Sequence, residues 1–139
     1  MIEEFPQECL KGINTQTPWD TNLFKIEENQ IPLNKSMKEQ FHCSTYQALF
    51  LYKRGRPNII PGVVFLMTQV TEPTQEDWKK LIKMMKFFNQ TKDDILTLEA
   101  KNLEIANWHT DIAFAVHPDF RSHTGMNLSF GKGTVTGVS

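Results

Sequence analysis

The chain has 139 residues, of which 40% are hydrophobic and ten are phenylalanine. This composition excludes a disordered segment, and the length allows one modest domain, or one small domain with part of another. The net charge is -1 and the pI is about 6.4, so the overall charge does not indicate nucleic-acid binding.

The cysteine content and the absence of a recognisable signal peptide favour a protein of the cytoplasm or nucleus that is not secreted. Cys9 and Cys43 are the only cysteines and have no CxxC spacing, which favours a reducing compartment. The N-terminal stretch MIEEFPQECL has acidic residues where a signal peptide has basic ones, and it lacks an apolar core. The longest apolar run, residues 59–67, is far shorter than the roughly 20 residues of a membrane span. We therefore expect no membrane partner.

Residues 1–35 are rich in turn-forming residues and show no sustained hydrophobic periodicity. This pattern predicts a mostly irregular lead-in with a short strand near residues 23–26. Ser36 is then expected to cap a first helix that continues to about Lys53. Arg54 to Arg56 break that helix.

Two further helices are predicted between residues 57 and 90. Pro57 fits the first turn of a helix that runs to about Val70. Thr74 and Asp77 have the spacing of a near capping box for a helix over residues 75–90. Apolar residues recur along that helix at helical spacing: Trp78, Leu81, Ile82, Met85 and Phe88. Short turns between the three helices predict a small antiparallel bundle over residues 36–92.

After Asp94 the hydrophobic period changes from about 3.6 to 2 residues, which indicates strands. Residues 100–102 are expected to form a turn, and residues 131–133 to join the last two strands. The predicted strands are residues 95–98, 105–116, 125–130 and 134–138. The expected fold class is thus α+β, with a lead-in (1–35), a helical bundle (36–92) and a sheet region (93–139).

The third predicted helix carries a row of basic residues opposite its apolar stripe: Lys79, Lys80, Lys83 and Lys86. The helical wheel places Phe87 among them. An aromatic ring between lysines can stack on nucleic acid while the ammonium groups neutralise phosphates. The alternative, preferred by about two to one, is that Phe87 packs against a neighbouring domain and the lysines keep the helix soluble.

Several potential metal ligands follow within one stretch: His109, Asp111, His117, Asp119 and His123. Zinc sites usually have more closely paired ligands, so a structural zinc site has roughly a one-in-ten chance. A turn at residues 117–119, in which Asp119 or Ser122 bonds the local backbone, is preferred. A hydrolytic triad of Ser122, His123 and Asp119 is discarded because no glycines frame the serine.

Asp111 differs from these residues because it lies in the middle of a predicted strand, WHTDIAFAV. Such a carboxylate faces either solvent, on an edge strand, or a functional site. Strand alternation alone favours solvent.

Two segments carry a resemblance to a known family. RGRPNIIPGVVFLMTQVTEPTQEDWKKLIKMMKFFNQT and the later NWHTDIAFAVHPDFRSHTGMNLSFGKG resemble, in that order, the C-terminal part of copia-type retrotransposon polyproteins. A weaker match, ALFLYKR, precedes them. The first segment is similar to the region after the polymerase palm, and the second to the opening of the ribonuclease H domain. Together they cover about residues 36–139.

The resemblance implies a reverse-transcriptase thumb, which grips the template–primer duplex, followed by the first strands of a ribonuclease H-like mixed sheet flanked by helices. It places Asp111 at the first metal-binding carboxylate of ribonuclease H. There it would bridge two Mg²⁺ ions during cleavage of RNA in an RNA–DNA hybrid. The implied partners are an RNA–DNA hybrid or duplex and the remaining polyprotein domains.

The chain departs from the family pattern at several places. Asn58 replaces an acidic residue, Ala113 a common serine and Met126 a small residue, and FFNQ stands in place of Tyr–Leu–x–Gly. No Tyr-x-Asp-Asp occurs, and the later ribonuclease H carboxylates would lie beyond Ser139. We therefore expect a fragment that lacks polymerase and nuclease turnover by itself and does not bind Mg²⁺ tightly.

The sequence leaves open two other interpretations besides a fragment of an enzyme. One is a non-catalytic nucleic-acid or protein binding module derived from a retroelement. The other is a decayed product without function. In each case a partial sheet would expose strand edges, which promote association with other chains.

Overall fold

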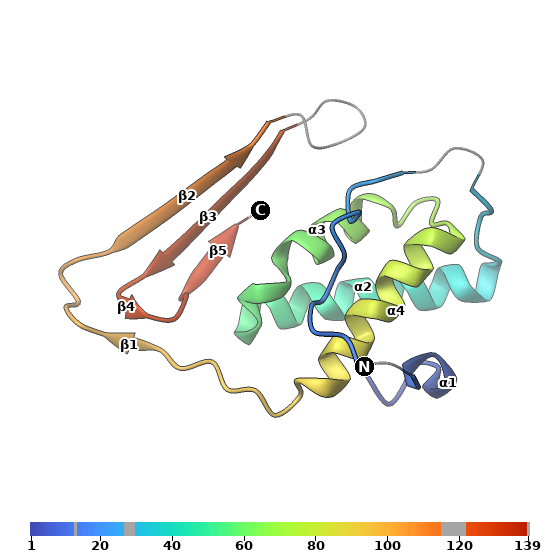
Figure 1. Cartoon of the computed structure of the whole chain (residues 1–139), viewed down its shortest axis with the longest axis horizontal. Coiled ribbons are helices and arrows are strands. Elements are labelled where there is room, and N and C mark those ends of the chain that lie inside the picture. The colour runs from blue at the N-terminus through green and yellow to red at the C-terminus, as the bar shows by residue number, and fades with distance from the viewer. Residues whose placement is uncertain (13, 27–29, 115–121, 139) are drawn as a thin grey trace.

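The computed structural model describes residues 1–12, 14–26, 30–114 and 122–138. Helices precede antiparallel strands along the chain, which confirms the predicted α+β class (Figure 1). The described helices are α1 (Gln7–Leu10), α2 (Lys35–Gly55), the 3₁₀ helix η1 (Pro57–Ile59), α3 (Ile60–Thr68) and α4 (Gln75–Gln90). The described strands are β1 (Glu99–Ala100), β2 (Asn107–Ala113), β3 (His123–Ser129), β4 (Gly131–Lys132) and β5 (Thr136–Val138). No helix in these ranges is long and apolar enough to cross a membrane.

Helix α2 begins earlier than expected. Asn34 has an extended backbone, and its side chain accepts a hydrogen bond from the Met37 N–H at 2.9 Å. The prediction that Ser36 caps this helix is wrong, because Ser36 already lies inside the first turn. At the other end, the Arg56 N–H donates to the Leu51 carbonyl at 3.1 Å.

The second predicted helix is divided in two. Pro57 starts η1, and α3 follows directly with Pro61 in its first turn, where a missing N–H costs nothing. Helix α3 ends at Thr68, two residues before the predicted end at Val70, and the Gln69 N–H closes it on Leu66.

Helix α4 has the predicted bounds. Its capping box is complete: the Asp77 carboxylate accepts from the Thr74 N–H at 3.0 Å, and the Thr74 hydroxyl accepts from the Asp77 N–H at 3.4 Å. These bonds satisfy donors that the first turn of a helix leaves without intrahelical partners. Asp77 is consequently buried without a lost hydrogen bond.

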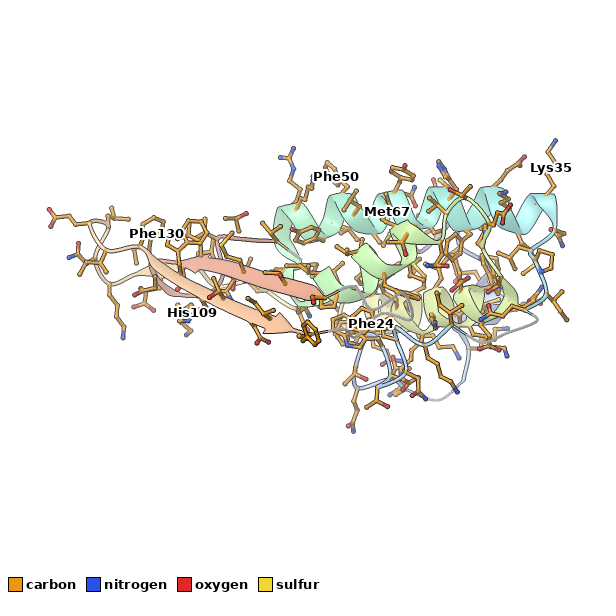
Figure 2. The ribbon with its side chains drawn as sticks, turned by 90° about the horizontal axis from the view of Figure 1, so that it is seen from above. Phe24, Lys35, Phe50, Met67, His109 and Phe130 are labelled. Atoms are coloured by element: carbon orange, nitrogen blue, oxygen red, sulfur yellow. The ribbon has the colours of Figure 1, made fainter. Side chains whose placement is uncertain are left out.

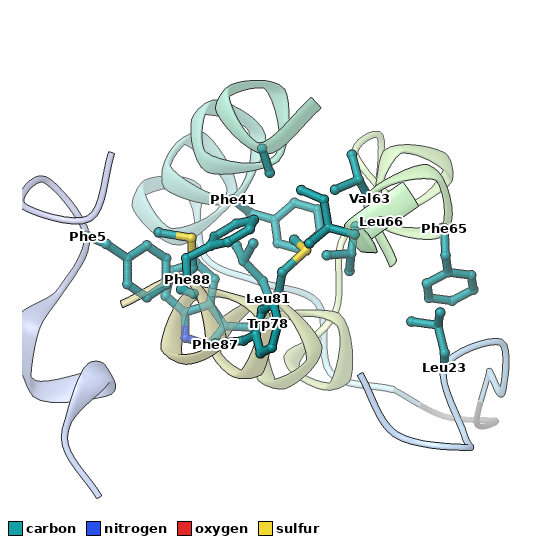
Figure 3. Packing of buried hydrophobic residues seen from close by; sticks show 14 of the residues in the cluster. Phe5, Leu23, Phe41, Val63, Phe65, Leu66, Trp78, Leu81, Phe87 and Phe88 are labelled. Carbon is teal, nitrogen blue, oxygen red and sulfur yellow. The ribbon is translucent and has the colours of Figure 1, made fainter. Parts of the chain in front are cut away.

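The core forms where α2, α3 and α4 meet (Figure 3). Four residues of the predicted stripe on α4 are buried, and Ile82 packs against them while partly exposed. Helix α2 contributes Phe41 and Ala48, and α3 contributes Val63, Phe65 and Leu66. The buried residues of α4 include Trp78, Leu81, Met84, Met85, Phe87 and Phe88.

The lead-in is part of this core. Phe5, Leu23 and Leu33 are buried, and the Phe5 ring stacks on Trp78 with centroids 5.4 Å apart. Backbone bonds join the lead-in to the start of α4, with the Gln75 N–H donating to the Ile31 carbonyl at 2.9 Å. Residues 23 and 24 lie in a turn, and residues 25 and 26 have no regular secondary structure, so the prediction of a strand there is wrong.

The strands form two antiparallel sheets, β1–β4 and β2–β3–β5. Residues 95–98 are exposed and form no strand, which contradicts the prediction; the first strand is β1, immediately after them. Strands β2, β3 and β5 correspond to the other three predicted strands, with shifted ends. Viewed from above, the strands project beyond the helices, and His109 and Phe130 lie on the projecting part (Figure 2).

The three-stranded sheet contacts the helices through β5. The Tyr52 hydroxyl donates a hydrogen bond to the Gly137 carbonyl. Gly137 is buried, and a Cβ at this position would lie 2.8 Å from the Ile60 Cδ1 atom. A larger residue here would require the Ile60 side chain to shift, so glycine favours the close approach of β5 to α3.

Candidate functional site

Asp111 lies on β2, in the ladder with β3, where it is directly opposite Gly125. Its side chain is exposed, and a Cβ on Gly125 would meet only the Asp111 carbonyl oxygen, at 3.9 Å. The carboxylate is uncovered on this face of the sheet, and all seven residues of β2 are likewise exposed.

The two faces of the sheet differ in character. Opposed residues of an antiparallel ladder share a face, so Asp111 lies on one face with His109, Asn127 and Gly137. The other face carries apolar side chains: Trp108, Ile112, Met126, Leu128 and Val138. Gly137 contacts Ile60, so the polar face is the one directed toward the helices.

An open cleft of about 400 Å³ lies between this polar face and the start of α3. Asp111, His109 and Asn127 line it from the sheet, and Asn58 and Pro57 line it from η1. Apolar residues, among them Ile60, Met126 and Val138, complete the lining, and Asp111 is the carboxylate among the described lining residues. A carboxylate can accept hydrogen bonds or contribute oxygen ligands to a cation.

The described residues do not supply the ligand set of a two-metal site. They contain no group of three or more His, Cys, Asp or Glu residues placed to hold a metal ion. His117, Asp119 and the side chain of His123 lie outside the described part of the chain, so the turn and zinc alternatives at these residues are not addressed. Ser122 is described but is exposed.

Tyr52 contacts the three-stranded sheet from α2, at the Gly137 carbonyl. Burial raises the pKa of the Tyr52 phenol above its ordinary value of 10.0. The neutral phenol is also the form that donates to the Gly137 carbonyl. Both effects keep Tyr52 protonated where the sheet meets α2.

The lysines of α4 contact the lead-in. Lys79 pairs with Glu76, and Lys83 pairs with Asp20. Lys80 donates to the Lys25 carbonyl at 2.8 Å, and its Nζ lies 4.4 Å from the centre of the Phe65 ring. The lead-in therefore covers part of the lysine row that the sequence predicted to face outward.

A second cleft, of about 310 Å³, lies between the lead-in and α4. Three of the four lysines line it, with Asp20 and Glu76 among them. Lys79 remains 68% exposed, whereas Lys83 is only 22% exposed. Lys86 lies beside Gly12, outside this cleft.

Phe87 does not accompany the lysines at the surface. Its side chain is only 8% exposed and belongs to the core cluster. The helical-wheel placement of Phe87 among exposed lysines is therefore wrong, and Phe87 packs in the core of the helical part and not against a neighbouring domain. The same cluster includes residues of the lead-in, a contribution that the irregular sequence pattern of residues 1–35 did not indicate.

No model of a known protein family matches this chain, and neither a curated protein nor a solved structure is similar enough to match it.

Proposed function

We propose that this chain corresponds to the end of a copia-type reverse transcriptase and the start of its ribonuclease H domain. The helices α2 to α4 would form the thumb, and β2, β3 and β5 would begin the ribonuclease H sheet. The parent polyprotein would carry out RNA-directed DNA synthesis and would degrade the RNA strand of RNA–DNA hybrids. The chain by itself would not turn over either reaction.

One observation carries the proposal beyond the sequence resemblance: the setting of Asp111. The residue lies in the middle of the longest ladder, opposite a glycine, at an open cleft whose lining mixes apolar residues with His109 and Asn127. A rigid strand that leaves its carboxylate uncovered is the kind of support that a metal-binding carboxylate requires.

The apolar face of the sheet supports the view that the sheet region belongs to a larger domain. Trp108 is 56% exposed, Ile112 68% and Val138 56%. Neighbouring apolar side chains on one sheet face are normally covered by another layer. Helices of a complete ribonuclease H-like domain would provide such a layer.

The isolated chain provides the first test. We expect no cleavage of an RNA–DNA hybrid in Mg²⁺, because two Mg²⁺ ions need several oxygen ligands in a fixed geometry and Asp111 is one. Cleavage by the purified chain that disappears in Asp111→Asn, but persists in Asp93→Asn, would contradict this expectation. Asp93 is the matched control because it is also exposed but lies outside the cleft.

A second candidate function is non-catalytic binding of nucleic acid through the lysines of α4. The observation that favours it is the cleft lined by Lys79, Lys80 and Lys83. Phosphates in contact with lysine release counterions, so affinity for a duplex or hybrid should fall steeply as salt rises.

Lys79 and Lys86 are the lysines to change: Lys79 is 68% exposed and lines the cleft, and Lys86 continues the row beside Gly12, whereas Lys83 is only 22% exposed and pairs with Asp20. We expect the double variant Lys79→Glu with Lys86→Glu to lower affinity and to flatten the salt dependence measured by fluorescence anisotropy. Lys35→Glu, an exposed lysine at the start of α2 that is not part of the lysine row, is the matched control (Figure 2). Binding that ignores salt, or that Lys35→Glu reduces equally, would exclude this function.

A further inference from the structure

Strand β2 forms an edge of its sheet. Within the described residues it pairs only with β3, and all seven of its residues are exposed. An exposed strand of this length offers a row of unpaired backbone N–H and C=O groups. We propose that β2 of a second copy of this chain binds here, antiparallel, with a two-fold axis through Thr110.

Symmetry limits the possible registers. With a two-fold axis perpendicular to the sheet, each residue occupies the same face in both copies. Opposed residues of an antiparallel ladder must also share a face. The axis therefore passes through a residue position, and near the middle of β2 the choices are His109, Thr110 and Asp111.

An axis through Thr110 uses the whole strand. Asn107 would lie opposite Ala113 of the second copy, so that all seven residues are paired. On the apolar face, Trp108 would lie opposite Ile112 of the second copy, and this pair would occur twice. Pairs of aromatic and β-branched residues stabilise antiparallel ladders, and both side chains are more than half exposed in the single chain.

Charge selects the same axis on the polar face. His109 would lie opposite Asp111 of the second copy, twice, so that each imidazole N–H faces a carboxylate. An axis through Asp111 would place two carboxylates opposite each other, which destabilises a ladder. An axis through His109 would oppose two imidazoles and pair only five residues.

The second copy fits this edge because one short segment is complementary to itself on both faces. Apolar pairs fall on one face and acid–imidazole pairs on the other, from a single register. The result would be one six-stranded sheet in the order β5–β3–β2–β2–β3–β5, with the exposed apolar residues of both copies in a continuous band. This inference depends on β2 alone and not on the proposed function.

Cysteine cross-linking reads the register directly. Cys9 and Cys43 are free and would first be changed to serine. Opposed Cα atoms in an antiparallel ladder are about 4.5–5.5 Å apart, within the range of a disulfide. Thr110→Cys should therefore form an intermolecular disulfide under mild oxidation. Residues one step from the axis would be about 8 Å from their own copies, beyond that range, so His109→Cys and Asp111→Cys should cross-link much more slowly.

Thr124→Cys is the matched control, because Thr124 is exposed on the same sheet face but on the central strand. It should not cross-link. A chain that stays monomeric in sedimentation equilibrium up to high micromolar concentration would overturn the proposal and would leave the edge to a strand of a longer polyprotein. Faster cross-linking at position 109 or 111 than at 110 would also overturn the proposed register.

A charge exchange tests the polar face. Asp111→Lys should weaken dimerisation by about tenfold or more, because two favourable pairs become unfavourable. Adding His109→Glu should restore most of the affinity, since each lysine would again face a carboxylate. If the double variant dimerises no better than Asp111→Lys alone, the pairing of residues 109 and 111 is wrong.

Discussion

Thr74 and Asp77 each satisfy a backbone donor of the other at the start of α4. Asp77 is only 3% exposed, so its carboxylate depends on the Thr74 N–H and hydroxyl, which lie 3.0 and 2.7 Å from its Oδ2 atom. A buried carboxylate that loses a donor keeps its desolvation cost.

We therefore expect Thr74→Ala to lower the free energy of unfolding by about 1–2 kcal/mol, measured by urea denaturation. Thr71→Ala, three residues earlier and exposed, is the control and should change stability by less than about 0.5 kcal/mol. Equal effects of the two changes would argue against a stabilising role of the cap.

Tyr52 makes a second prediction at the residue scale. Tyr52→Phe removes the hydrogen bond to the Gly137 carbonyl and should cost about 1 kcal/mol near neutral pH. Burial raises the Tyr52 pKa above 10.0, so the folded state holds this proton more tightly than the unfolded state. The contribution is complete below the unfolded pKa and is lost as the pH rises through the folded pKa.

The free energy of unfolding of the wild type should therefore exceed that of Tyr52→Phe near neutral pH, and this difference should disappear above about pH 10. Unfolding measured at several pH values checks this expectation. Tyr46→Phe is the control because Tyr46 is exposed. A difference between wild type and Tyr52→Phe that is independent of pH would show that ionisation of Tyr52 does not matter.

At the scale of elements, two glycines have opposite roles. Gly133 follows β4 with a φ of +79°, and a Cβ there would lie 2.3 Å from the Thr97 carbonyl oxygen. A backbone atom cannot move aside as a side chain can. Gly55 ends α2, and a Cβ there would meet nothing within 4 Å.

Gly133→Ala should therefore destabilise the β1–β4 pair, with increased hydrogen exchange at residues 99–101 and 131–132. Gly55→Ala should instead stabilise the chain by up to about 1 kcal/mol, because alanine restricts the unfolded chain. If Gly133→Ala and Gly55→Ala change hydrogen exchange in β1 and β4 to the same extent, the close approach of Gly133 to Thr97 does not determine the stability of the β1–β4 pair.

The elements also show what the sequence could predict. Helix α4 was predictable to the residue because its caps and apolar spacing are local properties of residues 74–90. The helical wheel could not place Phe87, because the surface that buries it comes from residues distant in sequence. Residues 95–98 alternate like a strand but have no partner strand in the described part of the chain, and pairing depends on the rest of the fold.

At the scale of the whole molecule, the helical part is well packed and the sheet part is not. The lead-in contributes Phe5, Leu23 and Leu33 to the helical core. These apolar residues are isolated in the sequence, so no periodic pattern predicts that they are buried. The sheet leaves Trp108 and Ile112 exposed on the face away from the helices. The described residues therefore form one buried core and leave one sheet face available to another layer.

Asp111 could be singled out from the sequence because it interrupts an apolar strand. Its opposition to Gly125 and the cleft beside it could not, since both depend on the register with β3 and on the approach of β5 to α3. The lysine row was likewise visible in the sequence, but its contacts with Asp20 and Lys25 were not.

We propose that Asp111 is the first carboxylate of a ribonuclease H site, and complementation tests this proposal most directly. The chain would be joined after Ser139 to the remaining part of a copia-type ribonuclease H domain, and cleavage of an RNA–DNA hybrid would be measured in Mg²⁺. We predict cleavage that Asp111→Asn abolishes and Asp93→Asn leaves intact. A folded fusion that cleaves equally well with Asp111→Asn, or that does not cleave at all, would contradict the account.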